Sequence, residues 1–338
     1  MTGSMRGIVE RARGLDVESL LGLRPPYPPI AVSVESEDAV LVRLRPRGRK
    51  PARLESHALR TLEAETIPRS IFQAQARSPD SLAERLRELF EASGTRPGRV
   101  SIVLPDNLAK ISLIVLPERP GSARDLEELV RARMRRAVPF RLEDARFRHQ
   151  LLAGEGREVS VLVVLVRRAL VEGLERAIEA IGGRVGLVDV ATSNLVNLCH
   201  GRIEAASRDG ADVALLNEAG RYFSLVIFRA GRLIFFRSKT LGEDAAGAPP
   251  NGELTRELAG SLSYYREKLG GQGIDTLFVR TLQGAPDALV EAFGAVAPRQ
   301  VVPIDPLADV DLGDLPALDP ALAQRLAPAI GAAIGRGR

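Results

Sequence analysis

The pattern of hydrophobic and polar positions first predicts a meander of strands. Apolar residues alternate with polar ones over several stretches that are bounded by turn residues, which is typical of half-buried strands. These stretches are 30–46, with a polar turn from Glu35 to Asp38, then 53–63 and 99–107. Before the last of them, residues 78–94 repeat leucine and phenylalanine at helical spacing and end at Gly94, which predicts an amphipathic helix.

Predicted strands and helices then continue to the end of the chain. Expected strands are 109–117, 145–154, 157–168 and 274–282, and expected helices are 122–140, 169–183, 251–269, 286–294 and 320–335. A hairpin over 212–237 opens the second half, with a tight turn at Ala230-Gly231. Both halves therefore begin with a meander and go on with alternating helix and strand. That order predicts a duplicated α/β architecture.

Length and composition are those of a cytoplasmic protein that is large enough to form two hydrophobic cores. The chain has 338 residues, of which 45% are hydrophobic and 27% charged. Its one cysteine, Cys199, excludes an internal disulfide, and its longest apolar run, 161–166, is far shorter than the ~20 residues of a bilayer span. Charged residues near the N-terminus argue against a signal peptide. With 4% aromatic residues and no tryptophan, we expect no nucleic-acid binding.

Few side chains suggest catalysis or metal binding. His57, His149 and His200 are far apart and lack metal-ligand spacing, and Cys199 cannot face its neighbour His200 on a helix. The basic run 43–50 is either a contact for anionic groups or a solvated hairpin tip, and we favour the tip. We therefore predict neither a nucleophile–base pair nor a metal site.

Several short motifs carry a resemblance to a known family. They are "VPF" at 138–140 followed by "LED" at 142–144, the strand–helix–strand run 161–190, the hairpin with Gly231 fourteen positions after Asn217, and the closing "LAPAIGAAIG" at 326–335. In this order they resemble the actin-like ATPase superfamily. Within it, the chain is similar from about residue 30 to 338 to the PilM family of type IV pilus assembly proteins, which is related to the division protein FtsA.

The resemblance implies an α/β, actin-like (Hsp70/FtsA-type) fold of two domains. Residues 1–29 would be an N-terminal extension, and 30–108 with 184–204 the main part of domain 1. Residues 109–183 would form a small subdomain inserted in domain 1, and 205–338 would form domain 2. The segment 241–254 is much shorter than in the family, so we expect a reduced lid subdomain at about 242–272.

The family's nucleotide-binding loops are altered at each place where the resemblance puts them. The first phosphate loop has Ser33 and Glu35 where the family has Asp and Gly, followed by Ser36, and the second has Asn217 and Ala219 where the family has Asp and Gly, followed by Gly220. Carboxylates near the first loop repel phosphate, and the methyl of Ala219 blocks close approach of the backbone. In the adenosine loop, Gly284 is the only nearby glycine. We therefore predict no cofactor and no ATPase activity. Binding of Mg-ATP remains the alternative.

The family resemblance also implies a partner. Its members bind the short N-terminal cytoplasmic peptide of an inner-membrane PilN-like protein, in a groove between domain 1 and the inserted subdomain. We expect a non-catalytic scaffold at the inner face of the cytoplasmic membrane, in contact with pilus motor or platform proteins. Candidate groove residues, besides strand 109–117, are Arg131, Met134, Arg135, Val138 and Phe140. For Met134 and Val138 the subdomain core is the alternative.

Two other functions remain open. The first is an ATP-binding switch or ATPase of the same fold, which micromolar affinity for Mg-ATP would favour. The second is a cytoplasmic component of a type II secretion platform. Such chains normally continue into a transmembrane helix, and none follows Arg338.

Overall fold

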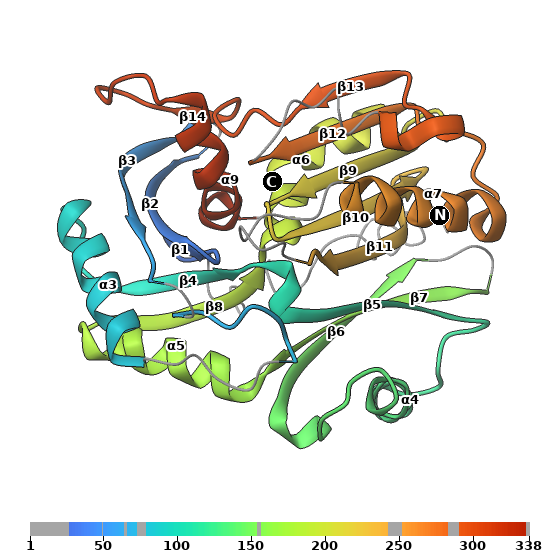
Figure 1. Ribbon diagram of the computed structural model, residues 1–338, viewed down its shortest axis with the longest axis horizontal. Coiled ribbons are helices and arrows are strands. Elements are labelled where there is room, and N and C mark those ends of the chain that lie inside the picture. The colour runs from blue at the N-terminus through green and yellow to red at the C-terminus, as the bar shows by residue number, and fades with distance from the viewer. Residues whose placement is uncertain are drawn as a thin grey trace, which may run out of the picture.

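Three separate β-sheets organise the chain (Figure 1). The computed structural model describes residues 27–48, 50–63, 66–72, 79–153, 157–242, 252–282 and 291–335. One sheet lies with the N-terminal strands, one with the strands of the second half, and a small one beneath them in Figure 1. Helices cover the faces of all three sheets.

The first domain is built on a six-stranded sheet in the order β14-β3-β2-β1-β4-β8. Its strands are β1 (Ile30–Val34), β2 (Asp38–Arg47), β3 (Lys50–Thr61), β4 (Arg99–Leu104), β8 (Arg184–Val190) and β14 (Val310–Asp311). The meander β1–β3 is antiparallel, whereas β4 and β8 run parallel to β1. Helices α3 (Pro79–Ala92) and α5 (Arg168–Ala180) pack on one face through leucine-rich stripes.

The second domain has a five-stranded sheet in the order β11-β10-β9-β12-β13. The strands are β9 (Asp212–Glu218), β10 (Tyr222–Arg229), β11 (Arg232–Thr240), β12 (Thr276–Thr281) and β13 (Gln300–Pro303). Helix α7 (Glu253–Leu269) and the short helix η3 (Glu291–Val296) cover its outer face. Ala230 and Gly231 both have positive φ, at 49° and 73°, which confirms the expected tight turn between β10 and β11.

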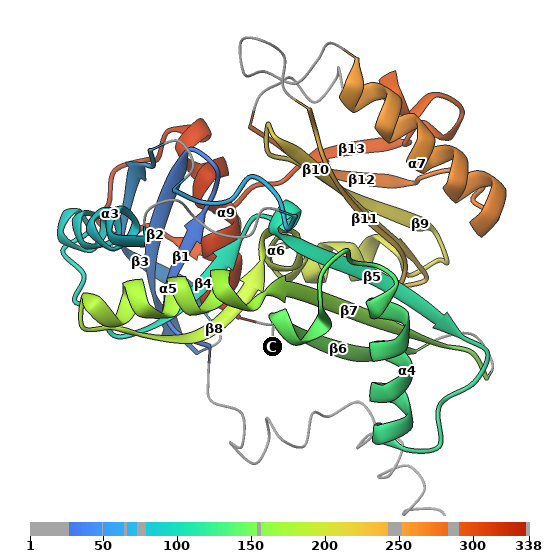
Figure 2. The same ribbon diagram turned by 60° about the horizontal axis from the view of Figure 1, so that its bottom comes forward.

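The small sheet has the order β5-β7-β6 and is fully antiparallel. Its strands are β5 (Ala109–Leu116), β6 (Ala145–Ala153) and β7 (Val159–Arg167), and helix α4 (Ala123–Arg135) packs on one face. Two short helices, η1 (Asp106–Leu108) and η2 (Leu142–Asp144), lead into β5 and β6. Figure 2 shows this sheet and α4 standing beside β8 and α5.

Two helices join the large sheets into one body. Helices α6 (Ala191–Ala206) and α9 (Pro320–Ile334) belong to a single core that includes Val103 of the first sheet and Leu215 of the second. The two helices approach so closely that a Cβ placed on Gly331 would lie 2.1 Å from the main-chain oxygen of Asn194. Only a glycine permits this contact between helix backbones.

The packing assigns some segments differently from the ranges expected from the sequence. Helix α5 lies within 109–183 but packs on the first domain's sheet. Strand β14 and helix α9 lie within 205–338, yet β14 pairs with β3 at the edge of that sheet and α9 packs on its other face. Helix α4 ends at Arg135 rather than at 140. Residues 243–251, in the expected lid, lie outside the described residues, so the reduced lid stays a prediction.

Candidate functional site

The first candidate site lies where the two domains meet, around the side chain of Arg280. Arg280 ends the apolar run of β12 and is fully buried. Its Nη1 donates a hydrogen bond to Oδ1 of Asn217 on β9 at 2.8 Å, and its Nε donates to the main-chain oxygen of Gln324 on α9 at 2.9 Å. A buried guanidinium with such partners links the second domain's sheet to a helix of the first.

The hydrogen-bond network continues from Asn217 to a buried carboxylate, Asp106. Asn217 Nδ2 donates to Oγ1 of Thr192 at 3.0 Å, and this hydroxyl donates to Asp106. The hydroxyl of Ser224 also donates to Asp106, at 2.6 Å, as does the main-chain N–H of Thr192, at 3.1 Å. Burial raises the pKa of Asp106, although these donors oppose the shift. The network therefore holds η1, α6, β9 and β10 together.

The three carboxylates of the β1–β2 turn each face a partner. Arg325 of α9 forms an ion pair with Asp38, and Arg221 forms one with Glu37 at 3.2 Å. The Tyr222 hydroxyl lies 3.4 Å from Oε1 of Glu35. Burial raises the pKa of Glu35 to about 8, although the positive charge of Arg280 opposes the shift. Glu35 and Glu37 thus tie the turn to the second domain, whereas Asp38 holds it to α9.

A glutamate binds the backbone of the second loop. Glu218 is buried, and its carboxylate accepts hydrogen bonds from the main-chain N–H of Gly220 at 2.5 Å and of Leu282 at 3.0 Å. The Thr281 hydroxyl donates to it as well, at 2.7 Å. Main-chain N–H groups in such loops are the donors that hold phosphate in nucleotide sites. Here the chain's own carboxylate uses the N–H of Gly220, and it also holds that of Leu282 beyond β12.

The residues expected at the phosphate loops are therefore mostly enclosed. Ser33, Asn217 and Gly220 are buried, and Ser36 and Ala219 are half-buried. Asn217 is the one that joins the Arg280 network directly. Gly284 lies outside the described residues. Arg280, Asp106 and Ser224 were not among the candidate residues from the sequence. A charged residue inside the apolar stretch "TLFVRT" was the available signal.

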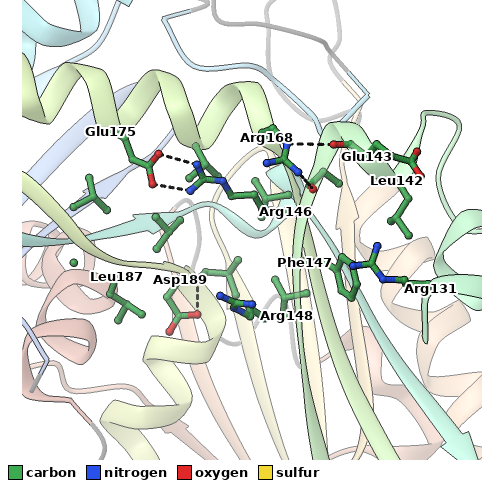
Figure 3. Close-up of a pocket in the computed structure, with 18 residues that line it drawn as sticks. Arg131, Leu142, Glu143, Arg146, Phe147, Arg148, Arg168, Glu175, Leu187 and Asp189 are labelled. Carbon is green, nitrogen blue, oxygen red and sulfur yellow. Dashed lines mark hydrogen bonds and ion pairs between the residues drawn. The ribbon is translucent and has the colours of Figure 1, made fainter. Parts of the chain in front are cut away.

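The second candidate site is a groove of about 830 Å³ between the first domain and the small sheet (Figure 3). Strand β8 and helix α5 form one wall, and strands β6 and β7 with α4 form the other. Six valines line it, namely Val164, Val166, Val171, Val185, Val188 and Val190. The volume lies within the ~300–1,000 Å³ range of ligand pockets.

Both walls of the groove are sheet edges. In the described part of the chain, β8 pairs only with β4, and β6 pairs only with β7. A strand at an edge has main-chain N–H and C=O groups that can pair with another extended chain. Two facing edges above an apolar floor are suited to an extended peptide, which would add its own backbone to one of them.

Basic side chains surround the groove. Arg146 forms a bidentate pair with Glu175 across it, at 2.7 and 3.0 Å, and Arg168 donates to the main-chain oxygen of Glu143 at 3.2 Å (Figure 3). Arg131 lies over the ring of Phe147, with Cζ 4.8 Å from the ring centroid. Among the described residues, none pairs with the exposed guanidinium of Arg148. Arg148 is therefore available to a ligand.

The five candidate groove residues from the sequence are not brought together. Arg131 lines the groove, but Met134 and Val138 are buried in the core of the small sheet. Phe140 packs under Arg167, whose Cζ is 4.0 Å from the ring centroid, and Arg135 is exposed outside the groove lining. Sequence reasoning missed Arg146 and Arg148. Their alternation with apolar residues in "ARFRHQL" marks one polar face of a strand and was the signal for them.

The remaining titratable candidates occupy ordinary structural positions. Cys199 is buried, and burial raises its pKa to about 11. Its neighbour His200 is exposed and faces Glu204 at 3.3 Å. Among the described residues, no group of three metal-ligating side chains lies together.

Two α/β domains that face each other through their β-hairpins, with a small sheet inserted in the first, define an actin-like fold. A solved protein of Bacteroides thetaiotaomicron with an actin-like ATPase fold and unknown function matches with a TM-score of 0.51 and 11% identity, over 84% of this chain and 93% of that chain. The cytoplasmic domain of EpsL, an inner-membrane component of the type II secretion system of Vibrio cholerae, matches with a TM-score of 0.43 and 12% identity, over 89% and 94%.

The chain belongs to the family of the type IV pilus assembly protein PilM, whose family model matches residues 32–248. A solved PilM–PilN type IV pilus biogenesis complex contains a chain with a TM-score of 0.72 and 20% identity, over 92% of this chain and 97% of that chain. A search of curated sequences gave no significant match. Among the described helices, none combines the length and apolar character needed to cross a bilayer.

Proposed function

We propose that this protein is a non-catalytic cytoplasmic scaffold of a type IV pilus assembly platform. It binds the N-terminal cytoplasmic peptide of a PilN-like inner-membrane protein, and through that protein it sits at the inner face of the membrane. Family membership and the likeness to the chain of the PilM–PilN complex support this role. The observation that carries the peptide site is the groove between β8 and β6.

The groove fits an extended peptide in three respects. Its walls are two sheet edges that pair with no further described strand, so a peptide backbone gains hydrogen bonds on entering. Its valine floor removes apolar side chains from water, at roughly 25 cal/mol per Å² of buried surface. Arg148 offers a charged contact at the rim, where charge contributes mainly to selectivity and association rate.

The non-catalytic part of the proposal is supported by the inter-domain network. In an actin-like fold, a nucleotide lies between the two domains and needs free N–H groups, a bare backbone and a metal ion. Here Arg280 and Glu218 use that region for contacts within the chain. Asn217 supplies no charge for a metal and already bonds Arg280 and Thr192.

Peptide binding is tested with a fluorescein-labelled peptide covering the N-terminal cytoplasmic segment of the organism's PilN-like protein. We expect saturable binding to the full chain by fluorescence anisotropy. Leu187→Asp, which places a charge on the groove side of β8, should weaken binding by about tenfold or more. The control is Arg119→Glu, an exposed position outside the groove lining. Equal affinity for Leu187→Asp and the unaltered chain would place the peptide elsewhere.

Nucleotide binding is tested separately by calorimetric titration of the full chain with Mg-ATP. The proposal expects no saturable heat at millimolar nucleotide. A dissociation constant in the micromolar range would favour the alternative, an ATP-dependent switch of the same fold. A phosphate-release assay then tells a switch from an ATPase.

A further inference from the structure

The described chain begins beside the groove. Tyr27 packs against the end of α9, because a Cβ on Gly335 would lie 3.2 Å from its ring. Pro28 lies against β8, since a Cβ on Gly186 would be 3.0 Å from Pro28 Cγ. Gly186 is one of the groove residues. The segment that precedes Tyr27 is therefore connected at the wall of the groove.

That segment contains one stretch whose composition complements the groove. Residues 15–23, "LDVESLLGL", include five apolar residues, two acidic residues and no basic residue. Leu15, Asp16, Val17 and Glu18 alternate apolar and acidic side chains, so in an extended conformation the two kinds lie on opposite sides. The apolar side matches the valine floor, and the acidic side matches the exposed guanidinium of Arg148.

The connection between this stretch and Pro28 is long enough and extended enough for the stretch to enter the groove. Residues 24–29 read "RPPYPP", and proline with its preceding residue favours extended backbone. At about 3.1 to 3.4 Å per residue, the four residues between Leu23 and Pro28 span roughly 15 Å. The seven residues of β8 run for about 20 Å along the groove wall. Residues 15–23 can therefore lie beside β8 without moving Pro28.

We propose that residues 15–23 of this chain occupy the groove between β8 and β6 and compete with the partner's peptide for it. The inference rests on the proposed function, because it takes the groove as a peptide site. The N-terminal segment is then an internal competitor. It covers the two open strand edges until a partner peptide displaces it, which also shields those edges from pairing with other chains.

The effect has an expected size. A segment joined by a short linker acts at an effective concentration of about 1 mM. If residues 15–23 bind with a dissociation constant of about 100 μM, the internal segment weakens a competing peptide by about tenfold. A competing peptide therefore still binds, but at a tenfold higher concentration.

The test uses the full chain and a full-length variant, Val17→Asp with Leu21→Asp, in which two residues of the segment's apolar side become acidic. The probe is a fluorescein-labelled peptide of residues 12–26 of the unaltered sequence. We expect the probe to bind the variant about tenfold more tightly than the unaltered chain, at both low and high protein concentration. Arg148→Glu, added to the variant, should weaken the probe by about tenfold, while Arg119→Glu should not.

Equal affinity of the probe for the variant and the unaltered chain would overturn the proposal. A difference in affinity that emerges only at high protein concentration would also overturn it, because it indicates that the segment binds the groove of another copy. Hydrogen exchange gives a second readout. Amides of 184–190 and 145–153 should exchange faster in the variant, and unchanged exchange contradicts occupancy. The PilN-like peptide distinguishes the peptide site from the internal competitor. If this peptide binds the variant and the unaltered chain equally, and at the groove, the internal competitor is contradicted and the proposed peptide site stands.

Discussion

Arg280 donates a hydrogen bond from Nη1 to Oδ1 of Asn217 across 2.8 Å, with both side chains fully buried. The same guanidinium reaches the main chain of α9, so one side chain ties two strands of the second domain to a helix of the first. This contact lies where the two domains meet. It also makes the junction of the domains sensitive to single substitutions.

Arg280→Ala should be strongly destabilising. The change leaves Asn217 Oδ1 and the Gln324 carbonyl without their donor, and removes the positive charge that faces Glu35 and Asp106. Breaking a buried charged network of this kind costs about 3–5 kcal/mol. Urea unfolding measures the loss. Arg208→Ala, at an exposed position, should change stability by less than about 0.5 kcal/mol. A loss below about 1 kcal/mol for Arg280→Ala would mean that the contact does not hold the domains.

Glu35→Gln should change how stability depends on pH. Burial raises the pKa of Glu35 from 4.5 to about 8, so the folded chain keeps a proton that the unfolded chain loses. Stability contributed by the neutral carboxyl is present below pH 4.5 and declines as the pH rises toward 8. Glutamine has no proton to lose. The variant should therefore exceed the unaltered chain by on the order of 4 kcal/mol at pH 8 and match it near pH 4.

Urea unfolding at both pH values checks this, with Glu91→Gln at the exposed end of α3 as the control. The control should leave the pH dependence unchanged. A Glu35→Gln variant that is less stable than the unaltered chain at pH 8 would contradict a neutral, buried carboxyl.

Gly331→Ala should disrupt the packing of α9 on α6. The added methyl would lie 2.1 Å from the Asn194 main-chain oxygen, which is backbone and cannot turn aside. We expect a loss of about 3 kcal/mol. Gly201→Ala is the matched control, because it adds the same methyl to α6 with no atom within 4 Å and should stabilise by about 0.5–1 kcal/mol. Thermal unfolding that ranks the two variants in the opposite order would exclude this helix contact.

Cys199 should be chemically inert in the folded chain. Its thiol is fully buried and its pKa is raised to about 11, so the thiolate is scarce at neutral pH. Ellman's reagent at pH 8 should label the native protein far more slowly than the protein unfolded in guanidinium chloride. Rapid labelling of the native chain would revive a reactive role for Cys199 and His200.

Much of the local structure follows from the sequence. The alternation around Ala230-Gly231 predicted the β10–β11 hairpin, and the leucine stripe of 78–94 predicted α3. Each of these signals depends on residues close together in the chain. The local pattern placed helix ends less accurately than helix positions. Helix α4, for example, stops at Arg135 and not at 140.

The sequence by itself determined the order of helices and strands, because local periodicity carries that information, and the actin-like class came from the resemblance of its motifs to that superfamily. Only the tertiary structure decided that α9 and β14 join the first domain, that Arg280 fills the junction, and that β6 and β8 leave their edges facing one groove. These features bring together residues far apart in the chain. Such pairings depend on which buried surfaces and hydrogen-bond partners remain once each element has formed.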